Sequence, residues 1–382
     1  MESKARSAAA WIRPEQAALV RAIADRAGLL ISTVGTSASG RAGELAQALD
    51  AAPSTDLRNL LASTDVSCVL LLAADGLGEP RTSDDAEVIR AATERGVEVL
   101  TLEPLPASVL ELADLLGHEA AYTESLSGSA TGAASGGATL AGCRFMPLTR
   151  AARTLRDATE MLAEFGPVRA ATVEMLGAPV HGSLGARLFD ALDLALHLLG
   201  EPETVDASIS SVLPRSGSPA RESLRGLDGH LGANLRYADG RACTILASNQ
   251  ASSWEGRLTL LGEKGCVRLT HEGFEWRGTH GAVVDKSRRR PARRPRRGGV
   301  EAAATGTLRA AASGETDPAG DQHGAFVEAV AEQIGARHVS LFPPVFPSAE
   351  LSRVLAIGQA AMLSARTGVG ESPATFRRMV ER

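Results

Sequence analysis

Residues 185–202 read Gly-Ala-Arg-Leu-Phe-Asp-Ala-Leu-Asp-Leu-Ala-Leu-His-Leu-Leu-Gly-Glu-Pro, near the middle of a chain of 382 residues. Leucine, alanine and phenylalanine cover most of the circumference of an α-helix with this sequence, and such a helix is normally buried. Gly200, with Pro202 just beyond it, is typical of a helix C-terminus. We therefore predict a buried helix that ends at Gly200 and around which the rest of the chain is organised.

Four polar side chains interrupt this apolar helix: Arg187, Asp190, Asp193 and His197. At about 100° per residue they share one stripe roughly 120° wide. A buried charge without a partner is costly, so the stripe either pairs with neighbouring side chains or lines a pocket. The stripe has three interpretations: an internal ladder of ion pairs, a ligand or catalytic pocket, or a metal site. No second cluster of ligands accompanies the stripe, so we predict no metal site.

The composition favours a globular protein of two domains. A chain of 382 residues is too long for one ordinary core, and 44% hydrophobic with 22% charged residues lie in the usual range. A net charge of -5 gives no general case for nucleic-acid binding. No apolar run of about 18 residues or signal-peptide core is present, so we expect no membrane span. Scattered cysteines without CxxC spacing favour free thiols and a reducing, cytoplasmic setting: Cys68, Cys143, Cys243 and Cys266.

The first third of the chain alternates short apolar runs with helical patterns. This alternation indicates right-handed βαβ crossovers and a parallel sheet, so we predict an α/β domain over residues 14–121. Residues 1–13 read as a loose tail, and the Gly-, Ser- and Ala-rich residues 122–142 as a flexible crossover. The expected helices are 14–27, 40–49, 56–62 and 84–95, and the expected strands are 29–35, 66–73 and 97–102.

The pattern changes after residue 202 to the alternation of β-strands. Asp239-Gly240 and residues 262–265 are typical hairpin turns, so consecutive hairpins predict a large, mostly antiparallel sheet. We predict an α+β domain over residues 143–347, and a C-terminal helix and tail over residues 348–382. The expected helices are 148–165, 323–334 and 348–367, and the expected strands are 168–175, 207–213, 232–237, 242–248, 256–261 and 266–270.

An arginine-rich segment interrupts the second domain. Residues 287–299 read Ser-Arg-Arg-Arg-Pro-Ala-Arg-Arg-Pro-Arg-Arg-Gly-Gly, and nothing in this run can be buried. We predict a disordered insertion over residues 285–320. An auxiliary contact to a polyanion is the alternative. No aromatic residue lies among the arginines to stack on bases, so we expect no nucleic-acid partner.

Several runs, taken in order, resemble the Gfo/Idh/MocA oxidoreductases. Residues 56–72, Asp-Leu-Arg-Asn-Leu-Leu-Ala-Ser-Thr-Asp-Val-Ser-Cys-Val-Leu-Leu-Leu, are followed by a helix and by residues 96–105, Gly-Val-Glu-Val-Leu-Thr-Leu-Glu-Pro-Leu. The helix at 184–202 is similar to that family's active-site helix, residues 233–276 to its hairpin sheet, and residues 326–368 to its closing helices. The resemblance implies a Rossmann domain for NAD or NADP and a sugar-like substrate. It also implies a homo-oligomer, with a heteromer containing an active homologue as the alternative.

The chain departs from this family first at the cofactor site. A dinucleotide fold needs a strand that runs into a Gly-rich turn, whose N–H groups hold the pyrophosphate. Nothing before Pro14 reads as that strand or turn, so we expect both to be missing. Gly35, Thr36 and Ser37 follow a strand and are the remaining candidates for phosphate contact. Their glycine spacing does not match the fingerprint, and they fall where the family carries its second strand.

The remaining departures concern catalysis. Glu103 stands before Pro104, where the family's Glu-Lys-Pro motif has lysine, and a carboxylate does not stabilise an alkoxide as an ammonium does. On the helix, the family's Asp, His and Asp correspond to Ala186, Asp190 and Asp193. Asp190 lacks the near-neutral pKa of histidine.

Two histidines, His197 and His181, are the candidates to replace the family's acid/base histidine. The candidate contacts to the substrate or ligand are Arg187 and, again, His181. The sequence therefore favours an oxidoreductase-like protein with lost or altered catalysis. An active NAD(P)-dependent sugar oxidoreductase with an unconventional site is the first alternative. A ligand-sensing or regulatory partner subunit is the second.

Overall fold

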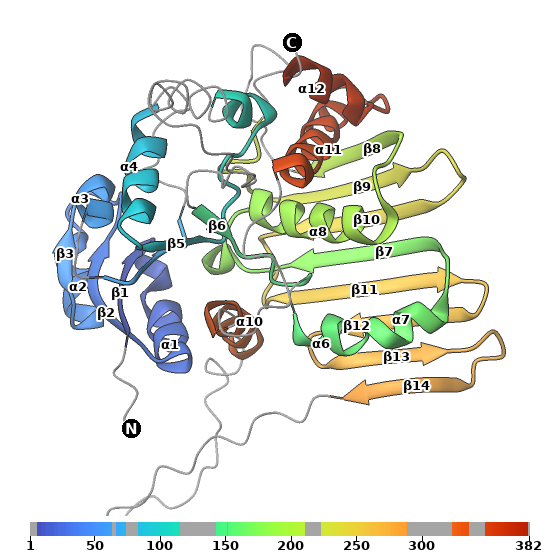
Figure 1. Cartoon of the computed structure of the whole chain (residues 1–382), viewed down its shortest axis with the longest axis horizontal. Helices are drawn as coiled ribbons and strands as arrows, with labels where there is room; N and C mark the ends of the chain where they lie inside the picture. The colour runs from blue at the N-terminus through green and yellow to red at the C-terminus, as the bar shows by residue number, and fades with distance from the viewer. Residues whose placement is uncertain are drawn as a thin grey trace, which may run out of the picture.

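Six parallel strands form the N-terminal sheet of the computed structural model, called sheet A here (Figure 1). The structure describes residues 6–62, 66–73, 83–114, 143–150, 152–210, 223–288, 323–335 and 348–380. The strand order β3-β2-β1-β4-β5-β6 reverses between β1 and β4, as in the doubly wound dinucleotide-binding fold. The strands are β1 Arg6–Trp11, β2 Leu29–Gly35, β3 Ala52–Ser54, β4 Cys68–Leu71, β5 Glu98–Thr101 and β6 Cys143–Phe145.

The central strand β1 corrects the prediction of a tail over residues 1–13 and of a missing first strand. It pairs in parallel with β2 on one side and β4 on the other. Ala8 and Ala10 face one helical layer, whereas Ala9 and Trp11 face the other, and all four are buried. Alanine is depleted in strands, so the run Arg-Ser-Ala-Ala-Ala-Trp gave no strand signal, but its small side chains suit a strand covered on both faces.

Helices cover both faces of sheet A. Helices α1 and α10 pack together in one layer, and α3 and α4 contribute to the core on the other side. Helix α10 therefore brings a segment from late in the sequence against the first helix of the chain. The bounds are α1 Ala17–Ala27, α2 Ala42–Leu49, α3 Leu57–Ala62, α4 Ser83–Glu94 and α10 Gly324–Gly335, with the short helix η1 at Pro14–Gln16 before α1.

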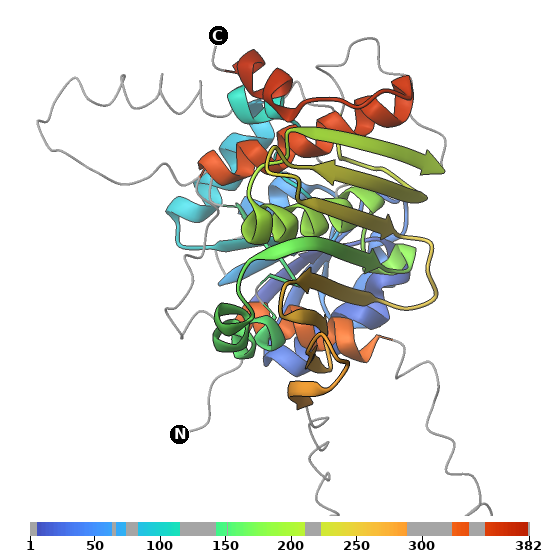
Figure 2. The same cartoon turned by 90° about the vertical axis from the view of Figure 1, so that its right-hand side faces the viewer.

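The second domain is built on sheet B, with the strand order β14-β13-β12-β11-β7-β10-β9-β8. Neighbouring strands are antiparallel except for β7 and β10, which confirms the predicted, mostly antiparallel sheet. Figure 2 looks onto sheet B with the N-terminal domain behind it. The strands are β7 Val168–Leu176, β8 Thr204–Ser210, β9 His230–Arg236, β10 Ala242–Ser248, β11 Glu255–Gly262, β12 Gly265–Thr270, β13 Gly273–Arg277 and β14 Val283–Arg288.

The buried helix predicted at the centre of the chain is α8, Leu184–Leu199, which packs on β7 and β10. Ser183 caps its N-terminus, and Gly200 closes it with a positive φ of 77°. The helix α11, Ser348–Thr367, lies against α8 and β8, and α12, Pro373–Val380, follows it (Figure 1). The core of this domain therefore lies between α8, α11 and sheet B.

Several boundaries differ from the sequence prediction, and three of these differences concern the segments from residue 122 to 165 and the insertion. The expected helix at 148–165 is two short helices, α6 Arg153–Asp157 and α7 Thr159–Phe165, which meet at Ala158. Strand β6 belongs to sheet A, so the second domain does not begin at residue 143. Residues 285–288 lie in β14, so the insertion cannot start at residue 285; its remainder, and the predicted crossover at 122–142, lie outside the described residues. None of the helices described here is long and apolar enough to cross a membrane.

Candidate functional site

The side chain of Gln16 lies at the point where the strand order of sheet A reverses. It follows β1 in the turn that leads into α1 and is fully buried. Its Oε1 accepts the Arg13 backbone N–H at 2.9 Å, and its Nε2 donates to the Leu72 carbonyl at 3.1 Å and to the Val180 carbonyl at 3.0 Å. Gln16 thus joins the turn after β1, the end of β4 and the second domain.

This turn does not fit the pyrophosphate of a dinucleotide. Such a group is held by free backbone N–H groups at the carboxyl end of the first strand. Pro14 has no N–H, the Arg13 N–H is bound by Gln16, and the Gln16 N–H donates to the Arg13 carbonyl at 3.0 Å. The first strand is therefore present, and the turn that follows it, residues 12–16, contains no glycine.

The alternative phosphate candidates lie at the end of β2. The ring of Trp11 packs against Gly35, where a Cβ atom would lie only 2.5 Å from two of the ring carbons. Thr36 is buried, and its Oγ1 accepts the Ala38 N–H at 3.2 Å. Of these three residues, only Ser37 is exposed. The loop after β2 therefore offers the exposed hydroxyls of Ser37 and Ser39 beside a closed aromatic contact.

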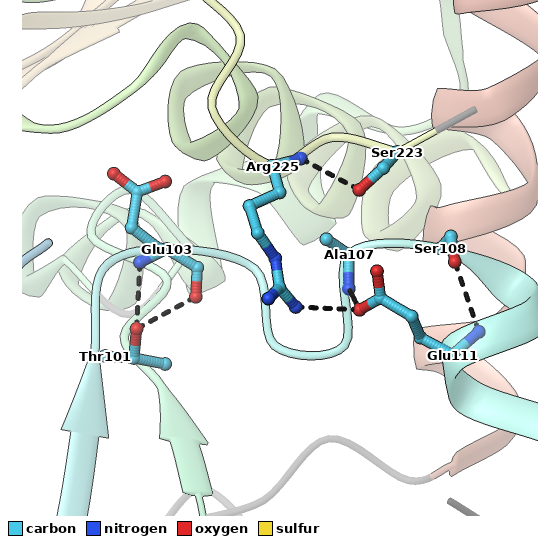
Figure 3. A network of polar contacts seen from close by, with 7 residues as sticks. All are labelled: Thr101, Glu103, Ala107, Ser108, Glu111, Ser223 and Arg225. Atoms are coloured by element: carbon cyan, nitrogen blue, oxygen red, sulfur yellow. Dashed lines mark hydrogen bonds and ion pairs between the residues drawn. The ribbon is translucent and has the colours of Figure 1, made fainter. Parts of the chain in front are cut away.

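Glu103 follows β5 in a tight turn that joins the two domains. The Thr101 hydroxyl accepts the Glu103 N–H at 3.0 Å and donates to the Glu103 carbonyl at 2.9 Å (Figure 3). The Glu103 carboxylate points away from this turn and accepts the Ser183 backbone N–H at 2.8 Å and the Ser183 hydroxyl. Burial raises the pKa of Glu103, whereas Ser183, Arg13 and Arg187 act in the opposite direction.

Glu103 therefore places its own carboxylate at the N-terminus of α8. The Ser183 hydroxyl also accepts the Ala186 N–H at 3.1 Å, so one side chain serves as helix cap and as carboxylate partner. A second link lies farther along the loop, where the Glu111 carboxylate binds Arg225 at 2.9 Å and the Ala107 N–H at 2.9 Å (Figure 3). The loop after Pro104 is thus held to the second domain at two points.

Arg187 is the largest fully buried side chain, with 2% of its surface exposed. Its Nη2 donates to the His181 carbonyl at 3.1 Å, and its guanidinium carbon lies 5.8 Å from the ring centroid of Phe326. Its Nε and Nη1 have no hydrogen-bond partner. Burial lowers the pKa of Arg187, and the nearby charges of Asp190 and Glu103 raise it.

The two aspartates of the stripe have partners next to α6. Asp190 accepts the Thr149 hydroxyl at 3.0 Å and the Thr149 N–H at 3.3 Å. Asp193 pairs with Arg150 at 2.9 Å, and Arg150 also lies 3.4 Å from Glu350. The Asp193 Oδ2 has no hydrogen-bond partner, and burial raises the pKa of Asp193 to about 8.

The stripe therefore divides into three parts. Asp193 is ion-paired with Arg150 while Asp190 is hydrogen-bonded by Thr149, Arg187 keeps two unpartnered nitrogens, and His197 lies exposed toward the far end of α8. The structure thus brings Arg187, Asp190, Glu103 and His181 to one end of α8 and leaves His197 apart. Among the described residues, no group of three or more His, Cys, Asp or Glu side chains is arranged to hold a metal ion.

His181 forms a buried pair with His323. The His181 Nδ1 accepts the Ala178 N–H at 3.0 Å, so its proton lies on Nε2, which is 2.9 Å from the His323 Nδ1. Burial, Arg187 and His323 lower the pKa of His181 to about 3, so it stays neutral near pH 7. The sequence analysis did not single out Gln16, Ser183 or His323, because each acquires its role from a partner far away in the sequence.

The comparisons with known proteins agree with this architecture. The family model of the GFO/IDH/MocA C-terminal domain matches residues 182–268, a stretch that includes α8 and most of sheet B. Residues 182–268 of the second domain are therefore similar to a GFO/IDH/MocA C-terminal domain. No curated protein matches the sequence significantly.

Solved structures show that the whole chain shares the fold of Gfo/Idh/MocA dehydrogenases. A levoglucosan dehydrogenase in complex with NADH and levoglucosan is 15% identical, with a TM-score of 0.58 over 96% of this chain and 99% of the other. The WlbA dehydrogenase from Bordetella pertussis, in complex with NADH and UDP-GlcNAcA, is 16% identical, with a TM-score of 0.56 over 97% and 99%. A myo-inositol dehydrogenase from Corynebacterium glutamicum is 16% identical, with a TM-score of 0.54 over 97% and 99%.

Proposed function

We propose that this chain is a Gfo/Idh/MocA-type protein that has lost nicotinamide-dependent hydride transfer and whose interdomain site binds a polar, sugar-like ligand. The observation that carries this proposal is Gln16. Its amide crosses the crevice between β1 and β4, where the fold family places the dinucleotide, and binds both edges of the crevice and the second domain. Its hydrogen bonds, together with Pro14, leave no free N–H group at positions 13, 14 and 16 of the turn for a pyrophosphate.

The catalytic positions support the same proposal. Glu103 stands where the resemblance expects lysine, and its carboxylate is bound to Ser183 rather than left free for a substrate. Asp190, at the position of the expected histidine, is bound to Thr149. No histidine restores an acid/base next to Asp190. His181 is held neutral in the pair with His323, and His197 is exposed toward the far end of α8. Three separate positions therefore disfavour hydride transfer.

Calorimetry with NAD, NADH, NADP and NADPH tests this proposal. We expect no binding of any of the four at millimolar concentration, because Gln16 occupies the crevice with satisfied hydrogen bonds. A nicotinamide-binding dehydrogenase of this fold, titrated in the same buffer, is the positive control. Micromolar binding of any of the four cofactors by this chain would overturn the proposal.

An active NAD(P)-dependent sugar oxidoreductase is the second candidate. It is favoured by the fold shared with NADH-bound dehydrogenases and by the exposed Ser37 at the carboxyl end of β2. If a cofactor binds, Ser37→Asp tests whether the loop after β2 holds its phosphate, because the added charge would repel a phosphate at that loop. Cofactor affinity that is unchanged in Ser37→Asp would exclude this loop as the phosphate site.

For the assembly, we infer a homo-oligomer rather than a heteromer, formed through the face of sheet B that α8 does not cover. Leu246 and Leu261 are 42% and 47% exposed on β10 and β11, on that face. Light scattering on the wild type and on Leu246→Arg tests this, since an arginine there would shift the protein toward monomer. Cys243 and Cys266 are free thiols, which supports a reducing, cytoplasmic setting.

A further inference from the structure

We propose that Arg187 recognises a carboxylate group on the ligand of the interdomain site. This inference rests on the proposed function, because it assumes that the site between the domains binds a ligand. It goes beyond the proposed function because it names the chemical group of the ligand, a monoanionic carboxylate, and the side chain that binds it.

The first argument is the hydrogen bonding of the guanidinium. Arg187 is 2% exposed, yet only its Nη2 has a partner, the His181 carbonyl. Nε and Nη1 are buried and unpartnered. Buried polar groups are nearly always hydrogen-bonded, and an unpaired buried cation is strongly unfavourable. A ligand that supplies acceptor atoms removes this cost.

The neighbouring carboxylates do not supply hydrogen-bond acceptors to the unpartnered nitrogens of Arg187. Glu103 is bound by Ser183, and Asp190 by Thr149. Neither makes an ion pair with Arg187, although both charges act on its pKa. They also limit the ligand, because a dianion such as phosphate would be repelled by two nearby negative charges. A single carboxylate matches the planar guanidinium, which can bind it through two parallel hydrogen bonds.

Two glycines leave room beside the guanidinium. A Cβ atom added at Gly177 would lie 3.6 Å from the Arg187 Cδ, and one added at Gly182 would lie 3.6 Å from its Nη2. Both are ordinary contact distances, so a single carbon atom at either position would touch its neighbours without displacing them. A ligand would approach this space between the domains, where Gln16 and Glu103 bridge them.

The test compares carboxylates with neutral molecules of similar shape, in chloride-free buffer at constant ionic strength. Acetate is compared with acetamide, and D-glucuronate with D-glucose, by calorimetry on the wild type, Arg187→Met and Arg257→Met. Arg257 lies on the open face of sheet B, 44% exposed, and controls for the loss of one positive charge. We expect at least one carboxylate to bind tenfold or more tightly than its neutral counterpart, with this preference lost in Arg187→Met and retained in Arg257→Met.

Two outcomes overturn the inference: no carboxylate preference in the wild type, or a preference that persists in Arg187→Met. If Arg187→Met does not fold, Arg187→Lys replaces it, and we expect its carboxylate preference to fall because a point charge loses the planar match. The titration with nicotinamide cofactors is independent of this one. A cofactor that binds overturns the proposed function, whereas a missing carboxylate preference with no cofactor binding overturns only the inference about Arg187.

Discussion

Gln16 and Arg187 are two buried polar side chains at the same boundary between the domains, and they differ in one respect. Gln16 has hydrogen-bond partners for its oxygen and its nitrogen, and these partners come from three parts of the fold. Arg187 has a partner for one of its three nitrogens. A satisfied buried group closes a site, because any ligand must first replace its bonds. A buried polar group without a partner favours ligand binding, because the ligand supplies the missing hydrogen bond and removes the free-energy cost of its absence.

The comparison predicts opposite behaviour for the two ends of the interdomain boundary. The crevice of sheet A is closed by neutral hydrogen bonds that tie β1, β4 and η3, Pro179–His181, together. Helix α8 and the residues at its N-terminus hold charged groups whose balance depends on Glu103, Asp190 and Asp193. Mutations in the first region should therefore change stability, and mutations in the second should change its dependence on pH or on ligands.

The largest effect is expected from Asp193, which like Arg187 has an unpartnered buried atom. Its folded-state pKa of about 8 lies above the value of an unfolded aspartate, so the folded state retains a proton that the unfolded state releases between about pH 4 and pH 8. Wild-type stability therefore falls as the pH rises through this window. Between pH 5 and pH 8, the free energy of unfolding of Asp193→Asn should rise by about 4 kcal/mol relative to that of the wild type.

Urea unfolding of both proteins at pH 5, 6.5 and 8 measures this difference. Asp157→Asn is the control, because Asp157 is 54% exposed and its substitution should leave the slope unchanged. If the free energy of unfolding depends on pH in the same way in the wild type and in Asp193→Asn, Arg150 keeps Asp193 ionised. The contrast between hydrogen-bonded and unpartnered buried groups would then not extend to Asp193.

The next effect is that of Gln16→Ala. This change removes three hydrogen bonds and leaves the Leu72 and Val180 carbonyls without that donor, so we expect a loss of about 3 kcal/mol in the free energy of unfolding. Gln47→Ala, on the exposed side of α2, is the matched control and should cost less than about 0.5 kcal/mol. Chemical denaturation measures both. Equal, small losses would mean that Gln16 does not hold the domains together.

A smaller effect is expected from Ser183→Ala. The hydroxyl caps α8 through the Ala186 N–H and donates to the Glu103 carboxylate. Its removal should cost about 2 kcal/mol, since a helix cap and a bond to a buried carboxylate are lost together. Ser183→Thr retains the hydroxyl and should recover most of this stability. If thermal unfolding shows the same loss for both variants, packing rather than hydrogen bonding decides the role of Ser183.

The smallest effect is expected from Arg187→Met without ligand. The substitution removes a buried charge that has one hydrogen bond and replaces it with an apolar chain of similar length, so stability should stay within about 1 kcal/mol of the wild type or rise. Urea unfolding in chloride-free buffer measures it. A loss as large as that of Gln16→Ala would show that Glu103 and Asp190 already satisfy Arg187, and would remove the difference on which the comparison rests.

The sequence predicted the two-domain architecture and the buried helix α8 because both have periodic apolar patterns. It missed β1, since Ala8, Ala9 and Ala10 have no strand preference and are strand residues only because β2 and β4 flank them. It also predicted one helix over 148–165, where α6 and α7 meet at Ala158. Helical spacing alone does not show such a break.

The candidate site was predicted in part. The stripe on α8 and the unusual position of Glu103 are visible in the sequence, because helical geometry places Arg187, Asp190 and Asp193 on one side. Which of these residues is satisfied is not visible. Thr149 and Arg150 bind the aspartates and Ser183 binds Glu103 through contacts that depend on how sheet A sits against sheet B.

The sequence by itself determined the alternation of strands and helices, the helix around which the second domain is built, and the absence of glycine from the turn after β1. These are local properties, because periodicity and residue type act over a few neighbouring positions. Only the tertiary structure decided that Gln16 spans the crevice and that Arg187 is buried with two nitrogens unpartnered. Hydrogen-bond satisfaction depends on atoms that are brought together from distant parts of the chain, and Gln16 and Val180 meet only after both domains have folded.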